Sequence, residues 1–397
     1  MPSILNIIAL TALAGSLSAR ALDPLLPHIA DEFGVSIASV ASFVSAFSFT
    51  FAIVQPAIGA AADLLGKVRL MLVCLILLGI ANILGASTHS FGMLFVTRIL
   101  AGVASGGIFP VLLGLASDLV APERRQVAIS RVLAGSLTGN LLGASASGMI
   151  GDVLGWRGVL VVLGGLMVVT AAVVALAFRN SPQKIQPVRA DLAVLRRGYR
   201  TIFSNPNAIV VFSAVFLEGS CIFGLFAYIA SFLVALGERS LSAAGIVIAG
   251  FAVGGLLYTL TVGRLMPRLG TNGMMLLGAG LLSLQLVLTA QDFGWKAQTA
   301  VMLFMGWGFY LLHGSIQVFS SELSVEARAT ALSLHSFFFF LGQTAGPIGY
   351  GIGIAYLGKT PTLLVSAATM LLVGYACTRL LRASRPADAA LHPEVEP

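Results

Sequence analysis

Titratable side chains are rare inside the long apolar runs of this sequence, and the few that occur there are the first candidates for chemistry. A charged group inside a membrane segment costs a few kcal/mol unless it is paired, so such residues usually serve a function. Carboxylates and imidazoles can bind and release protons, and a guanidinium group can hold an anion. The candidates within apolar runs are Arg20, Asp23, Arg98, Glu218, His313 and His335.

Glu218 lies about ten residues into an apolar run that begins near residue 207, next to Leu217 and close to Phe216 and Cys221. At a helical rise of about 1.5 Å per residue, this position is near the middle of a membrane. We therefore expect Glu218 to carry protons and Asp23 to take part in the same coupling. The alternative is a Glu218 that is permanently paired with an arginine or hydrogen-bonded to a neighbouring helix.

Arg20 and Asp23 are three residues apart, a spacing that places both on one face of a helix. They can form a local pair, and Arg20 can instead meet Glu218 where two halves of the chain face each other. A static salt bridge at an outer gate is the alternative for both. His313 titrates near physiological pH when exposed to water, so we expect it to contact a substrate or a proton; otherwise it is a packing residue.

Aromatic side chains accompany these polar residues and predict an apolar binding pocket. Phe223 and Phe226 follow Glu218 in the same run, and Tyr310 precedes His313 by three residues. Ligand pockets are mostly apolar and contain few polar groups. We expect Phe223, Phe226, Tyr310 and Arg20 to contact a substrate, with plain packing of the aromatic rings as the alternative.

The elements that must position these residues are membrane helices. Of the 397 residues, 57% are hydrophobic and only 10% are charged, whereas soluble domains contain about 25% charged residues. A soluble fold is excluded, and the apolar runs suit about a dozen spans of ~20 residues. The three cysteines lie in apolar runs without the spacing of a disulfide or metal site.

We predict an all-α polytopic protein with 12 transmembrane helices in two six-helix bundles, residues 1–178 and 207–382. A cytoplasmic linker at 179–206 joins the bundles; residues 191–203 within it form either an amphipathic helix or part of a solvated loop. Residues 383–397 are expected to be a disordered tail. The predicted spans are 3–27, 36–62, 70–88, 91–118, 127–153, 157–178, 207–234, 240–265, 272–290, 294–320, 328–354 and 359–382.

Lysine and arginine residues set the expected orientation. Sixteen lie in one set of loops, the linker and the flank of the last span, and four lie in the opposite loops. By the positive-inside rule, both termini and the linker are cytoplasmic in a multi-pass protein of the inner membrane. This alternation also argues that the net charge of +7 does not mark a nucleic-acid partner.

An internal repeat appears when the sequence is shifted by 204 residues. The shift maps Gly66 onto Gly270, and it aligns the polar residues at three loops. The further matched pairs are Gly59 with Gly263, Gly102 with Gly306, Asp118 with Glu322, and Arg124 with Arg328. Two six-helix halves related by an axis along the membrane normal are a transporter architecture.

The stretch Gly59-x-x-x-Asp63-x-x-Gly66-Lys67-x-Arg69 resembles the loop between helices 2 and 3 of the major facilitator superfamily (MFS). Arg98-Ile-Leu-Ala-Gly102 is similar to that family's helix 4 motif, and Leu22-Asp23-Pro24 lies where its twelve-helix exporters have a similar segment. The resemblance implies two bundles around a central site, and a role for Arg98 in proton release or anion binding, unless Arg98 only anchors helix 4. The residues expected to control gating are Gly59, Asp63, Gly66, Lys67, Arg69, Arg124, Glu322 and Arg328.

These features predict a monomeric secondary transporter that moves a small organic molecule by alternating access, energised by a proton gradient and without a cofactor. Proton-coupled efflux of a drug-like compound or metabolite is the preferred version, and proton-coupled uptake of an organic anion such as a carboxylate is the alternative. Lipid, protons and the substrate are the expected partners. An enzyme is disfavoured because the sequence contains no His-Glu-x-x-His motif and no phosphate-binding loop. A sensor or scaffold would differ by showing no flux of any ligand.

Overall fold

A computed structural model describes residues 2–120, 125–179, 192–324 and 327–381, and every regular element in these ranges is helical. The first half contains α1 (Pro2–Leu17), the 3₁₀ turn η1 (Asp23–Leu25), α2 (Leu26–Phe33), α3 (Ile37–Leu65), α4 (Lys67–Ser87), α5 (Phe91–Asp118) and α6 (Arg125–Phe178). The linker contains α7 (Leu192–Ser204). The second half contains α8 (Asn207–Glu218), the π-helical turn η3 (Gly219–Phe223), α9 (Gly224–Ala235), α10 (Leu241–Thr289), α11 (Trp295–Ser321), α12 (Arg328–Leu357) and α13 (Lys359–Leu380).

Two of these elements, α6 and α10, each consist of two spans joined at a glycine. Gly155 has φ 69° and ψ 175°, and Gly270 has φ 63° and ψ 177°. When their limbs are counted separately and α8, η3 and α9 are counted as one span, the described helices supply the twelve predicted spans. Eight of the helices are long and apolar enough to cross a membrane, and α1 is a shorter apolar helix.

Left-handed glycines make the tight turns between consecutive spans in both halves. Gly66 (φ 82°), Gly155 (φ 69°), Gly270 (φ 63°) and Gly358 (φ 89°) all adopt this conformation. A side chain with a Cβ is strained there, so glycine permits one span to end and the next to begin almost without a loop. Gly66 and Gly270, which the repeat aligns, thus make the same kind of turn.

The first span differs from its prediction as one helix over residues 3–27. Helix α1 ends at Leu17, a turn follows, and the chain resumes as η1 and α2. Pro24 and Pro27 lie in the first turns of η1 and α2. Proline has no N–H to donate and clashes with the preceding turn, so these residues begin new helices rather than continue the old one.

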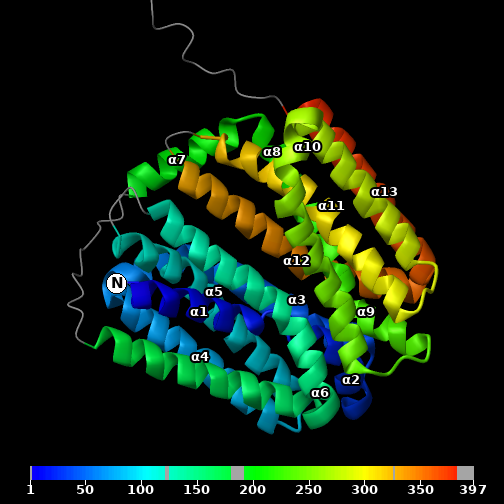
Figure 1. Cartoon of the computed structure of the whole chain (residues 1–397), viewed down its shortest axis with the longest axis horizontal. Helices are drawn as coiled ribbons and strands as arrows, with labels where there is room; N and C mark the ends of the chain where they lie inside the picture. Colours follow the sequence, from blue (N-terminus) through cyan, green and yellow to red (C-terminus); the bar gives the residue numbers. More distant parts are fainter. Residues whose placement is uncertain (1, 121–124, 180–191, 325–326, 382–397) are drawn as a thin grey trace, which may run out of the picture.

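The helices of the first half and of the second half form two groups that lie against each other (Figure 1). One apolar core cluster consists only of first-half residues, from Ile8 to Phe178. The other cluster joins the halves, since it includes Leu26 and Phe43 together with Leu225 and Leu241. The shared core therefore holds the halves together near the start of α3 and the start of α10.

The halves are packed backbone against backbone at this end, which we call the Gly155 end. A Cβ added to Gly148 of α6 would lie 2.2 Å from the Leu241 carbonyl oxygen of α10. One added to Gly245 of α10 would lie 2.6 Å from the Ala144 carbonyl oxygen of α6. The opposite end, the Gly66 end, carries the turns at Gly66 and Gly270 and the linker helix α7 (Figure 1).

Candidate functional site

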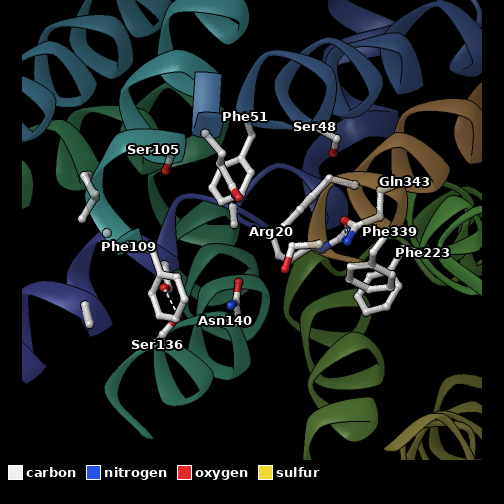
Figure 2. Close-up of a pocket in the computed structure, with 18 of the residues that line it drawn as sticks. Arg20, Ser48, Phe51, Ser105, Phe109, Ser136, Asn140, Phe223, Phe339 and Gln343 are labelled. Atoms are coloured by element: carbon white, nitrogen blue, oxygen red, sulfur yellow. Dashed lines mark hydrogen bonds between the residues drawn. The ribbon is translucent and has the colours of Figure 1, made fainter. Parts of the chain in front are cut away.

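A cavity of about 510 Å³ lies between the two halves. This volume is within the range of about 300–1,000 Å³ that is usual for small-molecule sites. Its walls come from α1, α3, α5 and α6 of the first half and from η3, α9, α10, α11 and α12 of the second. Figure 2 shows first-half residues such as Phe109 and Asn140 across the space from Phe223 and Gln343.

The cavity reaches toward the Gly66 end of the protein. Leu113 near the end of α5, Ser136 near the start of α6 and Leu332 near the start of α12 line it. Arg20 lines its other limit, beyond which the close contact of α6 and α10 seals the Gly155 end. The described conformation is therefore closed at the Gly155 end.

Ten of the described residues that line the cavity are phenylalanine or tyrosine. Phe51 of α3 and Phe340 of α12 meet across the two halves with ring centroids 4.3 Å apart. The predicted substrate residues Phe223, Phe226 and Tyr310 all line the cavity. The other aromatic lining residues are Phe47, Phe109, Phe251, Phe309 and Phe339.

Arg20 lies in the turn after α1 and points toward second-half residues. Its Nη2 donates a hydrogen bond of 2.6 Å to Oε1 of Gln343, and its Nη1 lies 3.4 Å from Oδ2 of Asp23. The guanidinium carbon lies 4.6 Å from the ring centroid of Phe223 and 5.2 Å from that of Phe226. The predicted local pair with Asp23 is confirmed, although the helix that was expected to carry both residues is broken.

The predicted alternative pairing of Arg20 with Glu218 is wrong. Glu218, at the end of α8, is fully buried and its Oε2 lies 2.7 Å from Nδ1 of His313. Arg20 contacts Gln343 and Asp23 instead, and no hydrogen bond joins Arg20 to Glu218 among the described residues. Asp23 is also 1% exposed and does not line the cavity.

Three titratable side chains from three different helices form a connected group. His313 of α11 lines the cavity, and its Nε2 lies 3.4 Å from Nε2 of His335 on α12. Glu218 and His335 lie behind it, 0% and 1% exposed. Glu218 Oε1 and His335 Nδ1 have no hydrogen-bond partner in the part of the chain that the structure describes. Unpaired polar atoms at such burial are costly, so this group is a candidate for a functional role.

Arg98, predicted to bind substrate, does not line the cavity. Its Nη2 donates to Oδ1 of Asn82 on α4 at 3.1 Å, and the residue is 3% exposed. The amide nitrogen of Asn82 in turn lies 3.5 Å from the hydroxyl of Ser18. This geometry suits a side chain that anchors α5 against α4 and the turn after α1.

The predicted gating residues that the structure describes lie at the Gly66 end. Lys67 Nζ forms a 2.5 Å salt bridge with Asp118 Oδ2 at the end of α5. Arg328 Nε donates to the Ser321 carbonyl oxygen at 3.1 Å, and Glu322 follows α11 as its C-terminal cap residue. Gly59 lies within α3 and Arg69 is exposed on α4. The Asp63 side chain and Arg124 are outside the described residues.

Asp152 makes a contact between the halves and was not among the predicted gating residues. Its carboxylate accepts hydrogen bonds from Leu241 N at 2.8 Å, Ser242 N at 2.9 Å and Ser240 Oγ at 3.1 Å. These donors are at the start of α10, where the helix dipole favours a negative charge. Asp152 lies three residues before Gly155, as Asp63 lies three residues before Gly66. This shared spacing is the feature of the sequence that could have indicated a role for Asp152.

Uncharged polar residues of the cavity were also missed. Gln343 and Asn140 lie in apolar spans and line the cavity, as does Ser136, whose hydroxyl lies 2.7 Å from that of Ser16. A search based on charge overlooks such side chains. An amide within an apolar span is the signal that finds Gln343 and Asn140.

Comparisons with known proteins agree with this arrangement. The family model of the Major Facilitator Superfamily matches residues 8–347. The chain is 26% identical over 397 residues to an MFS-type efflux pump of Mycolicibacterium smegmatis, covering 93% of this chain and 90% of that protein. It is 25% identical over 193 residues to the MFS-type transporter YfhI of Bacillus subtilis, and that match spans about half of each protein, 49%.

Among solved structures, that of the nucleoside transporter NupG is similar over 97% of this chain and 100% of its own, with a TM-score of 0.78 and 15% sequence identity. At that identity the likeness concerns the fold. The family match covers most of the sequence, including the helices that build the cavity, so this chain belongs to the Major Facilitator Superfamily of transporters.

Proposed function

We propose that this transporter exports a small organic molecule across the inner membrane in exchange for protons. The contact between buried Glu218 and cavity-lining His313 is the observation that carries the proposal. The similarity to an efflux pump supports the direction of transport. The distribution of lysine and arginine supports an orientation with both termini and the Gly66 end in the cytoplasm.

In this mechanism, the Gly66 end admits substrate to the cavity while the contact of α6 and α10 keeps the Gly155 end closed. The halves then rock about the site and open it to the other side, as is general for this architecture. A proton that enters from the cavity reaches His313 first. It passes along the 2.7 Å contact from His313 Nδ1 to Glu218 Oε2, and His335 extends the path on the other side of the imidazole.

Proton and substrate are coupled because His313 belongs to both environments. Its ring is stacked with that of Phe309, with centroids 4.8 Å apart, and both residues line the cavity. A substrate bound against this wall excludes water from His313 and so hinders proton exchange with Glu218. Release of the substrate restores the exchange, which gives antiport.

The test is Glu218→Gln in purified protein reconstituted into liposomes. A panel of aromatic acids, amides and amines is screened for accumulation under an imposed pH gradient, and entrapped pyranine reports proton movement. We expect the variant to bind and exchange the transported compound downhill but to lose gradient-driven accumulation. Cys221→Ser, in the same span and also buried, is the matched control and keeps the coupling.

Full accumulation by the Glu218→Gln variant would show that Glu218 is not the proton carrier. Uptake of an organic anion with protons is the second candidate, and it is favoured by the position of Arg20 on the cavity wall. In that case, substrate and proton move in the same direction, and the pyranine signal has the opposite sign.

A further inference from the structure

We propose that the cavity selects aromatic compounds that are neutral or carry one negative charge, and that it discriminates against cations. The proposal rests on the proposed transport function and names the substrate class of that same site. It is based on which charged side chains line the cavity and on the contacts that hold the Arg20 guanidinium.

Arg20 is the sole arginine, lysine, aspartate or glutamate among the described residues that line the cavity. Its counter-ion, Asp23, is 1% exposed and is not part of the lining. The ion pair therefore presents its positive member to the cavity and keeps its negative member behind the wall. A bound cation would meet this positive member first, and no carboxylate among the described lining residues could pair with the cation directly.

The two aromatic rings that contact Arg20 do not offset this repulsion for a cation. The face of a phenyl ring attracts positive charge when the ring is accessible. The rings of Phe223 and Phe226, however, already hold the Arg20 guanidinium at 4.6 and 5.2 Å. Loss of hydration is costly for any charged ligand without a partner, so a cation beside Arg20 loses hydration without compensation from these two rings.

An acceptor group on the ligand, in contrast, finds donors. The guanidinium is fixed by Gln343 through a 2.6 Å hydrogen bond and by the longer 3.4 Å contact with Asp23. A guanidinium has five N–H donors, so two such contacts leave donors for a carboxylate or an amide carbonyl. Figure 2 shows Arg20 and Gln343 beside Phe223 and Phe339, so a ligand that binds there places its ring against aromatic side chains.

The experiment compares three ligands that share a biphenyl group: 4-biphenylcarboxylate, 4-biphenylcarboxamide and 4-(aminomethyl)biphenyl, which carry charges of −1, 0 and +1 at neutral pH. Binding to the purified full chain is measured by calorimetry without any gradient. We expect the carboxylate and the amide to bind at least about tenfold more tightly than the amine. This factor corresponds to the loss of one charge-assisted contact.

Variants of Arg20 test whether this residue causes the preference for the carboxylate and the amide over the amine. Arg20→Gln should remove the advantage of the carboxylate over the amide and strengthen binding of the amine, and Arg20→Lys should restore the order. Arg98→Gln is the matched control, because Arg98 is a buried arginine of the same half that does not line the cavity. It should leave the order unchanged, and if Arg20→Gln does not fold, the order in the unmodified protein still decides.

Equal or tighter binding of the amine by the unmodified protein overturns the inference. So does an unchanged order in a folded Arg20→Gln variant, or failure of all three ligands to bind. If the binding order holds but no ligand moves across the membrane under any gradient, the proposed transport function fails while the assignment of ligand class stands.

Discussion

Replacing Asp152 with alanine should weaken the closure of the Gly155 end. In the described conformation, the Asp152 carboxylate of α6 accepts three hydrogen bonds from the start of α10. These are contacts between the two halves, so they exist only while this end is closed. Alanine removes all three without adding bulk.

The size of the effect follows from the number of bonds and their exposure. A hydrogen bond contributes about 0.5–1.5 kcal/mol net, and more when one partner is charged. Asp152 is exposed to solvent, and solvent screens its interactions, so the lower limit is appropriate for each of the three. The total is about 1.5 kcal/mol, which changes an equilibrium about tenfold. We therefore expect the population open at the Gly155 end to rise about tenfold relative to the closed one.

Distances between spin labels at Val153 of α6 and Tyr356 of α12 report this opening, because both side chains are highly exposed and lie on different halves near this end. The labels require a background in which the three buried cysteines are replaced. Glu32→Ala is the matched control. Glu32 contacts Trp156 and Arg157 within the first half, so its loss leaves the balance between the two states unchanged.

An Asp152→Ala distance distribution that matches the unmodified protein would refute this account of the closed end. An equal shift in Glu32→Ala would refute it as well, since the effect would then be a general loosening of the first half.

Two further predictions concern stability. Gly306→Ala should lower the free energy of unfolding by about 1–3 kcal/mol, because the added methyl would lie 1.7 Å from a backbone carbonyl oxygen of α10; Gly280→Ala, which meets nothing within 4 Å, should be tolerated in the same thermal melts. Burial acts to raise the pKa of Glu32, but hydrogen bonds from Arg157 and Trp156 outweigh it and hold the pKa of the carboxyl below its ordinary value. Glu32 thus stabilises the fold above its ordinary pKa, and this contribution is lost as the pH falls through its lowered value. The difference in melting temperature between the unmodified protein and Glu32→Ala should therefore shrink between pH 7 and pH 3, and a difference that is constant over this range would contradict the assignment.

The order of the spans could be predicted because apolar runs and polar loops follow the thickness of a membrane. The breaks at Gly155 and Gly270 coincide with predicted loops, since glycine there is a local signal that does not depend on distant residues. The interruption of the first span was also encoded locally, in Pro24 and Pro27. The π-helical turn after Glu218 had no such signal, because its backbone packs closely on α12: a Cβ at Gly219 would lie 2.4 Å from the Phe339 carbonyl oxygen.

The membership of the cavity could be predicted only in part. The search for aromatic and charged residues within apolar spans identified Arg20, Phe223 and His313, which line the cavity. Such residues are confined to a few positions in apolar spans, so they stand out in the sequence. Which of them meet depends on the rotation of each helix about its axis. For this reason the contact of Glu218 with His313 and the distance of Arg98 from the cavity emerged only from the packed structure.

The left-handed glycines also divide each half into smaller units. Each of the four is preceded at a distance of seven residues by another glycine, and these are Gly59, Gly148, Gly263 and Gly351. A step of 89 residues carries Asp63 onto Asp152 and Gly66 onto Gly155, as expected for three-span units that enter the bilayer from opposite faces. The later two units have Pro267 and Ala355 in place of the aspartate. The acidic position is thus kept in both units of the first half and replaced in both units of the second, so we expect the first half to supply the carboxylate that helps to close either end.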